Sequence, residues 1–464
     1  MPAFSPQCLI PALEAFPNAS RYWIAYSGGM DSEVLLHAIA SLRGLLRMDL
    51  CAIHVDHGLH ADSVSWAEHC RRRCGNLGVP LTIRHLALQP IRGESLEALA
   101  REARYGALRE CVAAGELLLT AQHRDDQAET LLLALMRGSG IKGLAAMPAV
   151  APFGEAWLLR PLLDRSRRDL LDYAGEEGLT WVEDPSNGNL AFDRNFLRAR
   201  ILPLLAERWP SCAVSLARTA GHCAEAQGLI DRVAGQVLEQ ARGARPGSVS
   251  VTRLSACRPP LVRATLRFWI AELGLPPPDS THLERIRAEV LGAAPDRSPL
   301  VSWKGCEIRR YRDEVFAMPP LPPRPRTTTF AWEQGALELP KGLGRLYLTN
   351  DAGAMLDPDA IRSHGLEVRF AVVGFSCRPG LRARNRRLKH LFQEACIPPW
   401  LRPYVPYLFA DEQLVAVGDL WRCAHASAKT DPPYRVHWEE GVRTHAGFGR
   451  GDESVTVQKP HSSL

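Results

Sequence analysis

Short apolar runs alternate with longer stretches of helical periodicity near the start of the chain, and this alternation restricts the fold more than any other feature. The apolar runs cover residues 22–26, 50–55, 80–86 and 116–121. Stretches with helical periodicity lie between them, at residues 33–46, 62–77 and 95–114. Short buried strands separated by helices predict an α/β fold with a doubly wound parallel sheet, whose ligand site lies at the carboxyl ends of the strands.

The length of 464 residues favours more than one domain. A region rich in Ala, Leu, Arg and Glu at helical spacing follows the α/β part, and five prolines between residues 319 and 325 then interrupt the pattern. We predict five segments: an α/β domain at residues 1–211, a small helical domain at 212–317, a proline-rich linker at 318–330, a C-terminal α+β domain at 331–440 and a flexible tail at 441–464.

Composition and charge are those of an ordinary globular protein. Hydrophobic residues make up 46% of the chain and charged residues 23%, and the formal net charge of +5 is too small to establish a nucleic-acid partner. The first residues lack a signal-peptide pattern, and no apolar run is long enough for a membrane helix. Twelve cysteines form no CxxC pair. We therefore expect a cytoplasmic protein that does not bind a membrane and whose thiols are reduced.

The segment IAYSGGMDSEVLLHAIA joins the first predicted strand to a helix through a glycine-rich loop. Two glycines let backbone N–H groups approach an anion closely, two serines add hydroxyl donors, and the positive end of the helix dipole faces the same point. A plain glycine-rich turn is the alternative, but strand, loop and helix follow in the order that anion binding requires. The loop predicts a polyphosphate site formed by Ser27, Gly28, Gly29, Met30, Asp31 and Ser32.

Asp31 is the acidic residue of this loop. A carboxylate beside a polyphosphate is repulsive unless a cation lies between them, so we predict that Asp31 binds Mg²⁺ and is needed for catalysis. The loop does not match the GxxxxGK[ST] pattern, which disfavours a kinase or GTPase of the Walker type.

Further polar residues follow the second and fourth predicted strands. His54 and His57 lie at the carboxyl end of the second strand, where the rest of a ligand that carries the polyphosphate would bind. One face of the helix after the fourth strand would carry His123, Asp126, Gln127 and Thr130, because residues three and four apart are neighbours on a helix. Histidines that only fill the core or the surface, and acids that only complement a helix N-terminus, are the alternatives.

The SGGMDS loop resembles the signature of the PP-loop ATP pyrophosphatases, which split ATP into AMP and pyrophosphate and activate an oxygen of the second substrate as an adenylate. Further motifs narrow the resemblance to the tRNA(Ile)-lysidine synthetase family. They are, in order, SGGMDS, HVDHGL, EARY, AQHRDDQAET, RGSGIKGLAAM, RPLLDRSRRDL, WVEDPSN and FDRNFLRARILP. Together these motifs cover most of residues 21–210.

The resemblance implies a two-step reaction that uses ATP and Mg²⁺. The C2 oxygen of the anticodon wobble cytidine in an isoleucine tRNA with a CAU anticodon attacks the α-phosphorus of ATP, and the ε-amine of free L-lysine then displaces AMP. A base can be reached in this way only in a single-stranded loop. The implied roles are charge stabilisation at the α-phosphate by Arg104, orientation and deprotonation of lysine by Asp126 with support from Glu129, nucleotide binding by His123, and contact with tRNA or nucleotide by Asn195 and Arg198.

The segment RRLKHLFQEACIPPWLRPYVPYLFADEQLVAVGDLW resembles the C-terminal tRNA-binding segment of the same family, with Cys396 where a small residue such as glycine is expected. A basic tract lies at its start, and Trp400 and Tyr404 follow. A solvated surface is the usual explanation of such a tract. Because no acid interrupts it, we expect contacts with tRNA phosphates from Arg378, Arg382, Arg384, Arg386, Arg387 and Lys389.

Several alternatives stay open. A PP-loop tRNA thiolase would need sulfur-carrying cysteines near the nucleotide, and no cysteine lies between Cys111 and Cys212. A non-catalytic RNA-binding protein would be expected to lack Asp31 or the second glycine of the loop, and both are present. The sequence assigns no role to the CxxxC pair Cys70 and Cys74, and it leaves a homodimer open.

Overall fold

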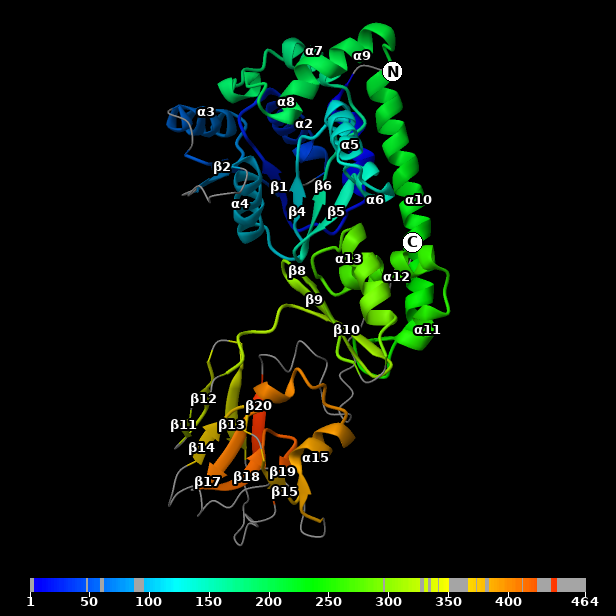
Figure 1. The fold of residues 1–464 in the computed structure, drawn as a ribbon. Helices are drawn as coiled ribbons and strands as arrows, with labels where there is room; N and C mark the ends of the chain where they lie inside the picture. The colour runs from blue at the N-terminus through cyan, green and yellow to red at the C-terminus, as the bar shows by residue number, and fades with distance from the viewer. Residues whose placement is uncertain are drawn as a thin grey trace. The chain divides into compact units, whose positions relative to one another are not determined.

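The computed structural model describes residues 4–46, 49–58, 62–86, 96–294, 297–325, 329–332, 335–340, 342–349, 366–372, 374–379, 384–410, 412–423 and 435–439. The chain divides into two compact units, Met1–Leu229 and Ile230–Leu464 (Figure 1). None of the helices in these described ranges combines the length and the apolar character needed to cross a membrane.

A six-stranded sheet forms the centre of the first unit, in the order β3-β2-β1-β4-β6-β5. Five strands are parallel, and β5 pairs antiparallel with β6 at one edge. The predicted parallel sheet is confirmed, and the antiparallel edge strand is a feature that the sequence does not predict. The strands are β1 (Tyr22–Ala25), β2 (Leu50–Asp56), β3 (Leu81–His85), β4 (Leu117–Leu119), β5 (Val150–Phe153) and β6 (Ala156–Leu159).

Helices cover both faces of this sheet, because successive strand residues point to opposite sides. Ile24 of β1 packs in one core with residues of α2, α3 and α7, and Trp23 packs in another core with residues of α4. The three predicted helices are confirmed as α2, α3 and α4. The helices of this unit are α1 (Ile10–Glu14), α2 (Met30–Leu46), α3 (Ser63–Asn76), α4 (Leu96–Cys111), α5 (Arg124–Met136), α6 (Ile141–Leu144), α7 (Arg167–Glu176), α8 (Asp193–Phe196) and α9 (Leu202–Arg208), with a π-helical turn at Leu197–Ile201.

The strand order reverses at β1, which has β2 on one side and β4 on the other. Ligands of open α/β sheets bind outside the carboxyl ends of the strands at such a point. The glycine-rich loop follows β1 directly, and α2 begins within the loop at Met30. The topology therefore places the loop, together with a helix N-terminus, at the expected ligand site.

The division between the two units falls within α10 (Cys212–Ala241). The next helices are α11 (Val251–Ser255), α12 (Pro259–Glu272) and α13 (Ser280–Arg285), and a π-helical turn follows at Ile286–Leu291. A four-stranded sheet in the order β7-β10-β9-β8 shares their core, formed by β7 (Val249–Ser250), β8 (Leu300–Trp303), β9 (Cys306–Tyr311) and β10 (Glu314–Met318). The helical prediction for this region misses the sheet, because charged side chains occupy much of β9. The boundaries at 211 and 317 stay predictions.

The C-terminal part combines antiparallel strands with the helix α15, which confirms the predicted α+β character. A five-stranded sheet has the order β11-β14-β17-β18-β19, and a three-stranded sheet has the order β12-β13-β20. The predicted tail at 441–464 lies outside the described residues, as does part of the predicted linker. The elements are β11 (Phe330–Trp332), β12 (Leu337–Glu338), β13 (Arg345–Thr349), β14 (Leu366–Arg369), β15 (Ser376–Cys377), β16 (Arg386–Arg387), α15 (Leu388–Glu394), β17 (Tyr407–Ala410), β18 (Gln413–Val417), β19 (Trp421–Arg422) and β20 (Arg435–Glu439).

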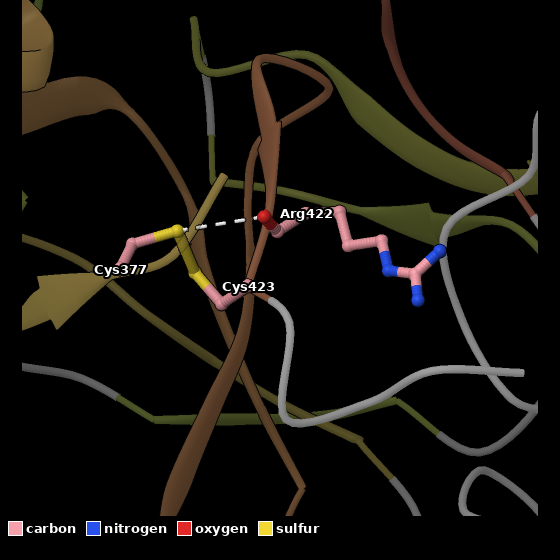
Figure 2. Close-up of a disulfide and its surroundings, with 3 residues drawn as sticks. All are labelled: Cys377, Arg422 and Cys423. Atoms are coloured by element: carbon pink, nitrogen blue, oxygen red, sulfur yellow. Dashed lines mark hydrogen bonds between the residues drawn. A yellow bond between two sulfur atoms is a disulfide. The ribbon is translucent and has the colours of Figure 1, made fainter. Parts of the chain in front are cut away.

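A disulfide joins Cys377 of β15 to Cys423, the residue after β19 (Figure 2). The two Cα atoms are 5.0 Å apart, and the Sγ atom of Cys377 lies 3.5 Å from the backbone oxygen of Arg422. Both cysteines are buried in the core of the C-terminal part. The prediction that all thiols are reduced is wrong for this pair, because cysteines 46 residues apart in the sequence meet only once the strands have paired.

Candidate active site

The glycine-rich loop is held in shape by its own serines. The Oγ atoms of Ser27 and Ser32 are 3.0 Å apart, and Ser32 Oγ donates to the backbone oxygen of Gly29 at 2.9 Å. The backbone N–H of Gly29 in turn donates to Ser27 Oγ at 3.3 Å. The structure therefore brings the predicted loop residues together into a compact turn at the N-terminus of α2.

Gly28 occupies a position where a side chain would not fit. Its φ of +85° lies in the left-handed region, which favours glycine. A Cβ atom there would lie 3.0 Å from Val182 Cγ2 and 3.1 Å from Cys70 Sγ. The backbone N–H of Val182 also donates to the Gly28 oxygen at 2.9 Å. The glycine is thus required both by the turn and by the close approach of two other segments.

Two adjoining cavities lie beside the loop, with volumes of about 620 and 870 Å³. Ser27, Gly29, Arg104 and Arg194 line both of them. The smaller cavity is also lined by polar residues that follow β2. The larger one is lined by Asp31 and by polar residues that follow β4. Residues predicted from separate motifs therefore surround one continuous site.

His54 and His57, which were predicted to bind the nucleotide, both line the smaller cavity. His54 is buried, and its Nδ1 lies 3.0 Å from the backbone oxygen of Tyr26. A carbonyl oxygen can only accept, so Nδ1 carries the proton and Nε2 is left as an acceptor. Burial lowers the pKa of His54 and of His57, and the charge of Arg104 adds to this effect at His57. Both rings are therefore neutral at pH 7 and can accept a hydrogen bond from a ligand.

Arg104 of α4 lies between the two cavities and lines both. No described carboxylate forms an ion pair with it, whereas Arg194 and Arg198 are each paired with two acids. Within the described part of the site, Arg104 is therefore a cation without an acidic partner, which suits a role in binding an anionic ligand.

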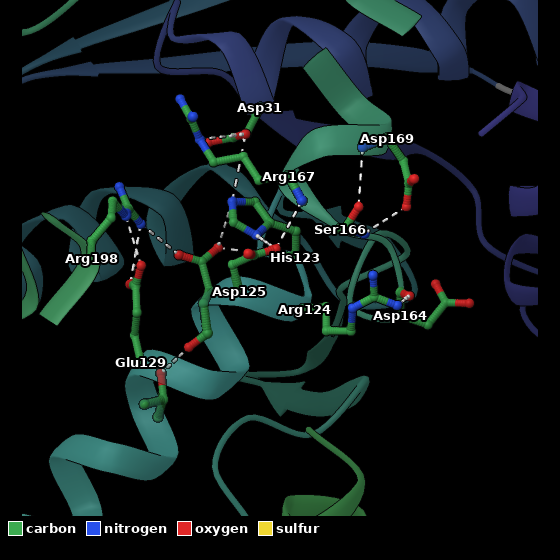
Figure 3. A network of polar contacts seen from close by, with 12 residues as sticks. Asp31, His123, Arg124, Asp125, Glu129, Asp164, Ser166, Arg167, Asp169 and Arg198 are labelled. Atoms are coloured by element: carbon green, nitrogen blue, oxygen red, sulfur yellow. Dashed lines mark hydrogen bonds and ion pairs between the residues drawn. The ribbon is translucent and has the colours of Figure 1, made fainter. Parts of the chain in front are cut away.

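His123 lies fully buried between three carboxylates, before the first turn of α5 (Figure 3). Its Nε2 is 3.6 Å from Asp31 Oδ1 and 3.5 Å from Asp126 Oδ2, and its Nδ1 is 3.6 Å from Asp125 Oδ2. Burial alone would lower the pKa of His123, but the three acids outweigh it and raise the pKa to about 10. His123 is therefore a buried cation that faces the acid of the glycine-rich loop.

Asp125 and Arg167 belong to this site, although the sequence analysis assigned no role to either. Asp125 Oδ2 accepts a hydrogen bond from the backbone N–H of Arg167 at 2.8 Å (Figure 3). The side chain of Arg167 lines the larger cavity, with Nε 4.0 Å from Asp31 Oδ1. The signal was present in the RPLLDRSRRDL motif, but only the fold shows that the start of α7 meets the start of α5.

Asp126 and Glu129 form a cluster of ion pairs with two arginines, and Asp126 also lines the larger cavity. Glu129 is fully buried, and its two carboxylate oxygens accept from Nε of Arg198 and Nε of Arg194, both at 2.6 Å. Asp126 Oδ1 lies 3.1 Å from Arg198 and 3.3 Å from Arg194. Arg194 was missed by the sequence analysis. Arg198, which was expected to hold tRNA or nucleotide, is engaged by the two acids, and Glu129 is placed to orient the arginines.

Asn195 stabilises the turn that lines the smaller cavity. Its Nδ2 donates to the backbone oxygens of Ser186 and Asn189, at 2.9 and 3.0 Å. These bonds hold the turn after Asp184 in place, within the WVEDPSN motif. Asn195, which was expected to contact tRNA or nucleotide, lines the cavity, but its amide group donates to the protein itself.

Asp31 offers a ligand for a divalent cation. Its Oδ1 atom is buried and makes no hydrogen bond within the described residues, although His123 Nε2 and Arg167 Nε lie 3.6 and 4.0 Å from it. Those residues also contain no group of three or more acids, histidines or cysteines placed to hold a metal ion by themselves. The donor set fits Mg²⁺ that arrives with a polyphosphate, since this ion usually keeps one or two carboxylates together with phosphate oxygens and water.

One arginine of the basic tract in the C-terminal part already has an acidic partner within the protein. Arg386 forms an ion pair with Glu394, with an NH1 to Oε2 distance of 2.6 Å. Arg382 lies outside the described residues, while Arg378, Arg384, Arg387 and Lys389 are exposed. Trp400 and Tyr404 are buried in the core, so these rings support the fold and do not present a stacking surface.

Comparison with known proteins covers most of the chain. The family models that match are a PP-loop domain at residues 7–205, a TilS substrate binding domain at 250–316 and a TilS substrate C-terminal domain at 366–438. A tRNA(Ile)-lysidine synthase of Methylococcus capsulatus is 43% identical over 90% of this chain and 96% of its own length. One from Alkalilimnicola ehrlichii is 41% identical over 95% of this chain and 98% of its own length. The chain belongs to the tRNA(Ile)-lysidine synthase family.

Proposed function

We propose that this protein ligates free L-lysine to C2 of the wobble cytidine in an isoleucine tRNA with a CAU anticodon. ATP activates the base as an adenylate with release of pyrophosphate, and lysine then displaces AMP to form lysidine. The product pairs with A in place of G, so codon specificity changes from AUG to AUA. The observation that carries this proposal is the convergence of the phosphate loop and the Asp126–Glu129 cluster on one pair of cavities.

The loop and its surroundings supply the groups for the adenylation step. Backbone N–H groups at the N-terminus of α2 and the serine hydroxyls can bind the leaving pyrophosphate. Asp31 would hold Mg²⁺, which neutralises phosphate charge when bound. Arg104 lies between the cavities and would stabilise the charge that develops at the α-phosphate. His54 and His57 would accept hydrogen bonds from the nucleoside.

The cluster at the start of α5 supports the lysine step. Asp126 lines the larger cavity, so its carboxylate is in reach of an ammonium group bound there. Glu129 is enclosed by Arg194 and Arg198 and holds the rigid arrangement around Asp126. Asp126 would therefore orient the lysine amine and accept its proton, with Glu129 as a positioning residue.

The tRNA is proposed to contact the exposed arginines of the basic tract through its phosphates. Matches to two substrate-binding domain models favour a lysidine synthase over a tRNA thiolase or a non-catalytic RNA-binding protein.

The test incubates the purified chain with a CAU-bearing isoleucine tRNA, ATP, Mg²⁺ and labelled lysine, and then digests the tRNA to nucleosides. We expect labelled lysine on cytidine, and none with a tRNA whose wobble base is altered. Asp31→Ala should abolish pyrophosphate release and leave tRNA binding nearly intact. Pyrophosphate release without lysine transfer would refute lysine as the nucleophile.

A further inference from the structure

A buried acid lies behind the phosphate loop, and none of the roles above uses it. Glu33 is fully buried in the first turn of α2. Its Oε2 accepts a hydrogen bond from the Tyr26 hydroxyl at 2.5 Å, and its Oε1 accepts one from Arg73 Nε at 2.7 Å. Burial and the charge of Glu33 both raise the pKa of Tyr26, so the phenol stays protonated and acts as the donor. Both oxygens of the buried carboxylate are thus engaged.

Glu33 joins the two ends of the loop. Tyr26 is the residue before the loop and Glu33 is the residue after it, so their side-chain hydrogen bond closes the turn from behind. The backbone N–H of Glu33 also donates to the oxygen of Gly29 at 2.9 Å. One residue therefore fixes the entry of the loop through its side chain and the middle of the loop through its backbone.

Arg73 connects this closure to α3, which supports the loop at a second point. Cys70 lies one turn before Arg73 on the same helix, and its Sγ is 3.1 Å from the place where a Cβ on Gly28 would lie. A shift of α3 would therefore change the space available to Gly28. The ion pair with Glu33 holds α3 against the start of α2 and also compensates a negative charge close to the polyphosphate site.

We propose that Tyr26, Glu33 and Arg73 form a positioning network that keeps the phosphate loop in its anion-binding conformation, so that affinity for Mg²⁺·ATP depends on it. The inference rests on the proposed function, because it assumes that the loop binds ATP. Donors that are already oriented need no reorganisation when the ligand binds, whereas a glycine-rich loop without this closure can adopt many other conformations.

The experiment measures Mg²⁺·ATP binding to the full-length protein by titration calorimetry, alongside thermal unfolding. Tyr26→Phe removes one hydrogen bond and leaves the ion pair, and we expect it to weaken ATP binding by about tenfold, the order expected for a lost hydrogen bond to a charged group. The steady-state KM for ATP should rise similarly, while tRNA binding stays unchanged. Arg71→Met is the matched control, since Arg71 lies on the same helix and, within the described residues, its ion pair is with the exposed Glu68.

The triple variant Tyr26→Phe with Glu33→Met and Arg73→Met separates positioning from stability, because it removes the ion pair without leaving the buried Tyr26 hydroxyl lacking an acceptor. Replacing a buried ion pair by apolar side chains often preserves stability. We expect thermal unfolding near that of the wild type but weak ATP binding. If the triple variant is stable and binds ATP as tightly as the wild type, the positioning role is wrong. Unchanged ATP binding in Tyr26→Phe would have the same meaning. Either result leaves the proposed function intact. Failure of the wild-type protein to bind Mg²⁺·ATP would instead overturn the proposed function and this inference with it.

Discussion

Two regions carry the charges of the proposed function, and they bury those charges to very different degrees. Around α5, Glu129 is fully enclosed and is bonded to two arginines. In the basic tract, the pair of Arg386 and Glu394 has side-chain exposures of 42% and 54%. A buried charge that loses its partner is destabilising, whereas an exposed one is rehydrated. Substitutions around α5 should therefore lower stability and catalytic activity. Substitutions in the basic tract should instead change the salt-dependent affinity for tRNA.

The largest expected difference is in the free energy of unfolding. Glu129→Leu leaves Asp126 as the one acidic partner of Arg194 and Arg198 among the described residues, and should cost about 3–5 kcal/mol as well as activity. Glu394→Leu removes the acid of the exposed pair and should cost less than about 1 kcal/mol. Urea unfolding of both variants measures this contrast. Equal losses would show that the two regions do not differ as their burial indicates.

An intermediate effect is expected on tRNA binding. Arg384 and Arg387 are exposed, so replacing both with Ala should weaken tRNA binding several-fold and reduce the salt slope by about 0.7–0.9 for each phosphate that is no longer neutralised. Arg386→Ala should have a smaller effect, because Arg386 is already paired with Glu394. Filter binding over a series of salt concentrations tests both, with Asp31→Ala as the control. An unchanged salt slope would mean that the basic tract does not contact tRNA phosphates.

The smallest expected effect is at Cys396, where the family resemblance implies a small residue such as glycine. Cys396 follows α15 with a φ of +55°, a left-handed conformation that glycine adopts without strain. Cys396→Gly should therefore raise the free energy of unfolding by less than about 1 kcal/mol, which thermal unfolding can detect. A loss of stability would mean that the contact of its Sγ with Arg312, at 2.8 Å, outweighs the backbone strain.

Site residues could be predicted where they are close together in the sequence, and not where their partners are far away in the chain. The phosphate loop was found because Ser27 to Ser32 are adjacent in the sequence and lie between a strand and a helix. Arg194 was missed because its partner Glu129 lies 65 residues away, and nothing local distinguishes it from a solvated arginine. The burial of Trp400 could not be predicted for a related reason, since only the packed core shows that its ring is enclosed.

The sequence by itself determined the α/β alternation, the glycine-rich loop between the first strand and the next helix, and the family, because these depend on periodicity and on short motifs that are local in the chain. Tertiary structure alone decided that Glu33 meets Arg73, that Glu129 meets two arginines, and that Cys377 meets Cys423. These contacts join residues far apart in the sequence, and they follow from which strands pair and which helix faces pack together. Local pattern specifies the elements, and burial between them decides which charges are paired.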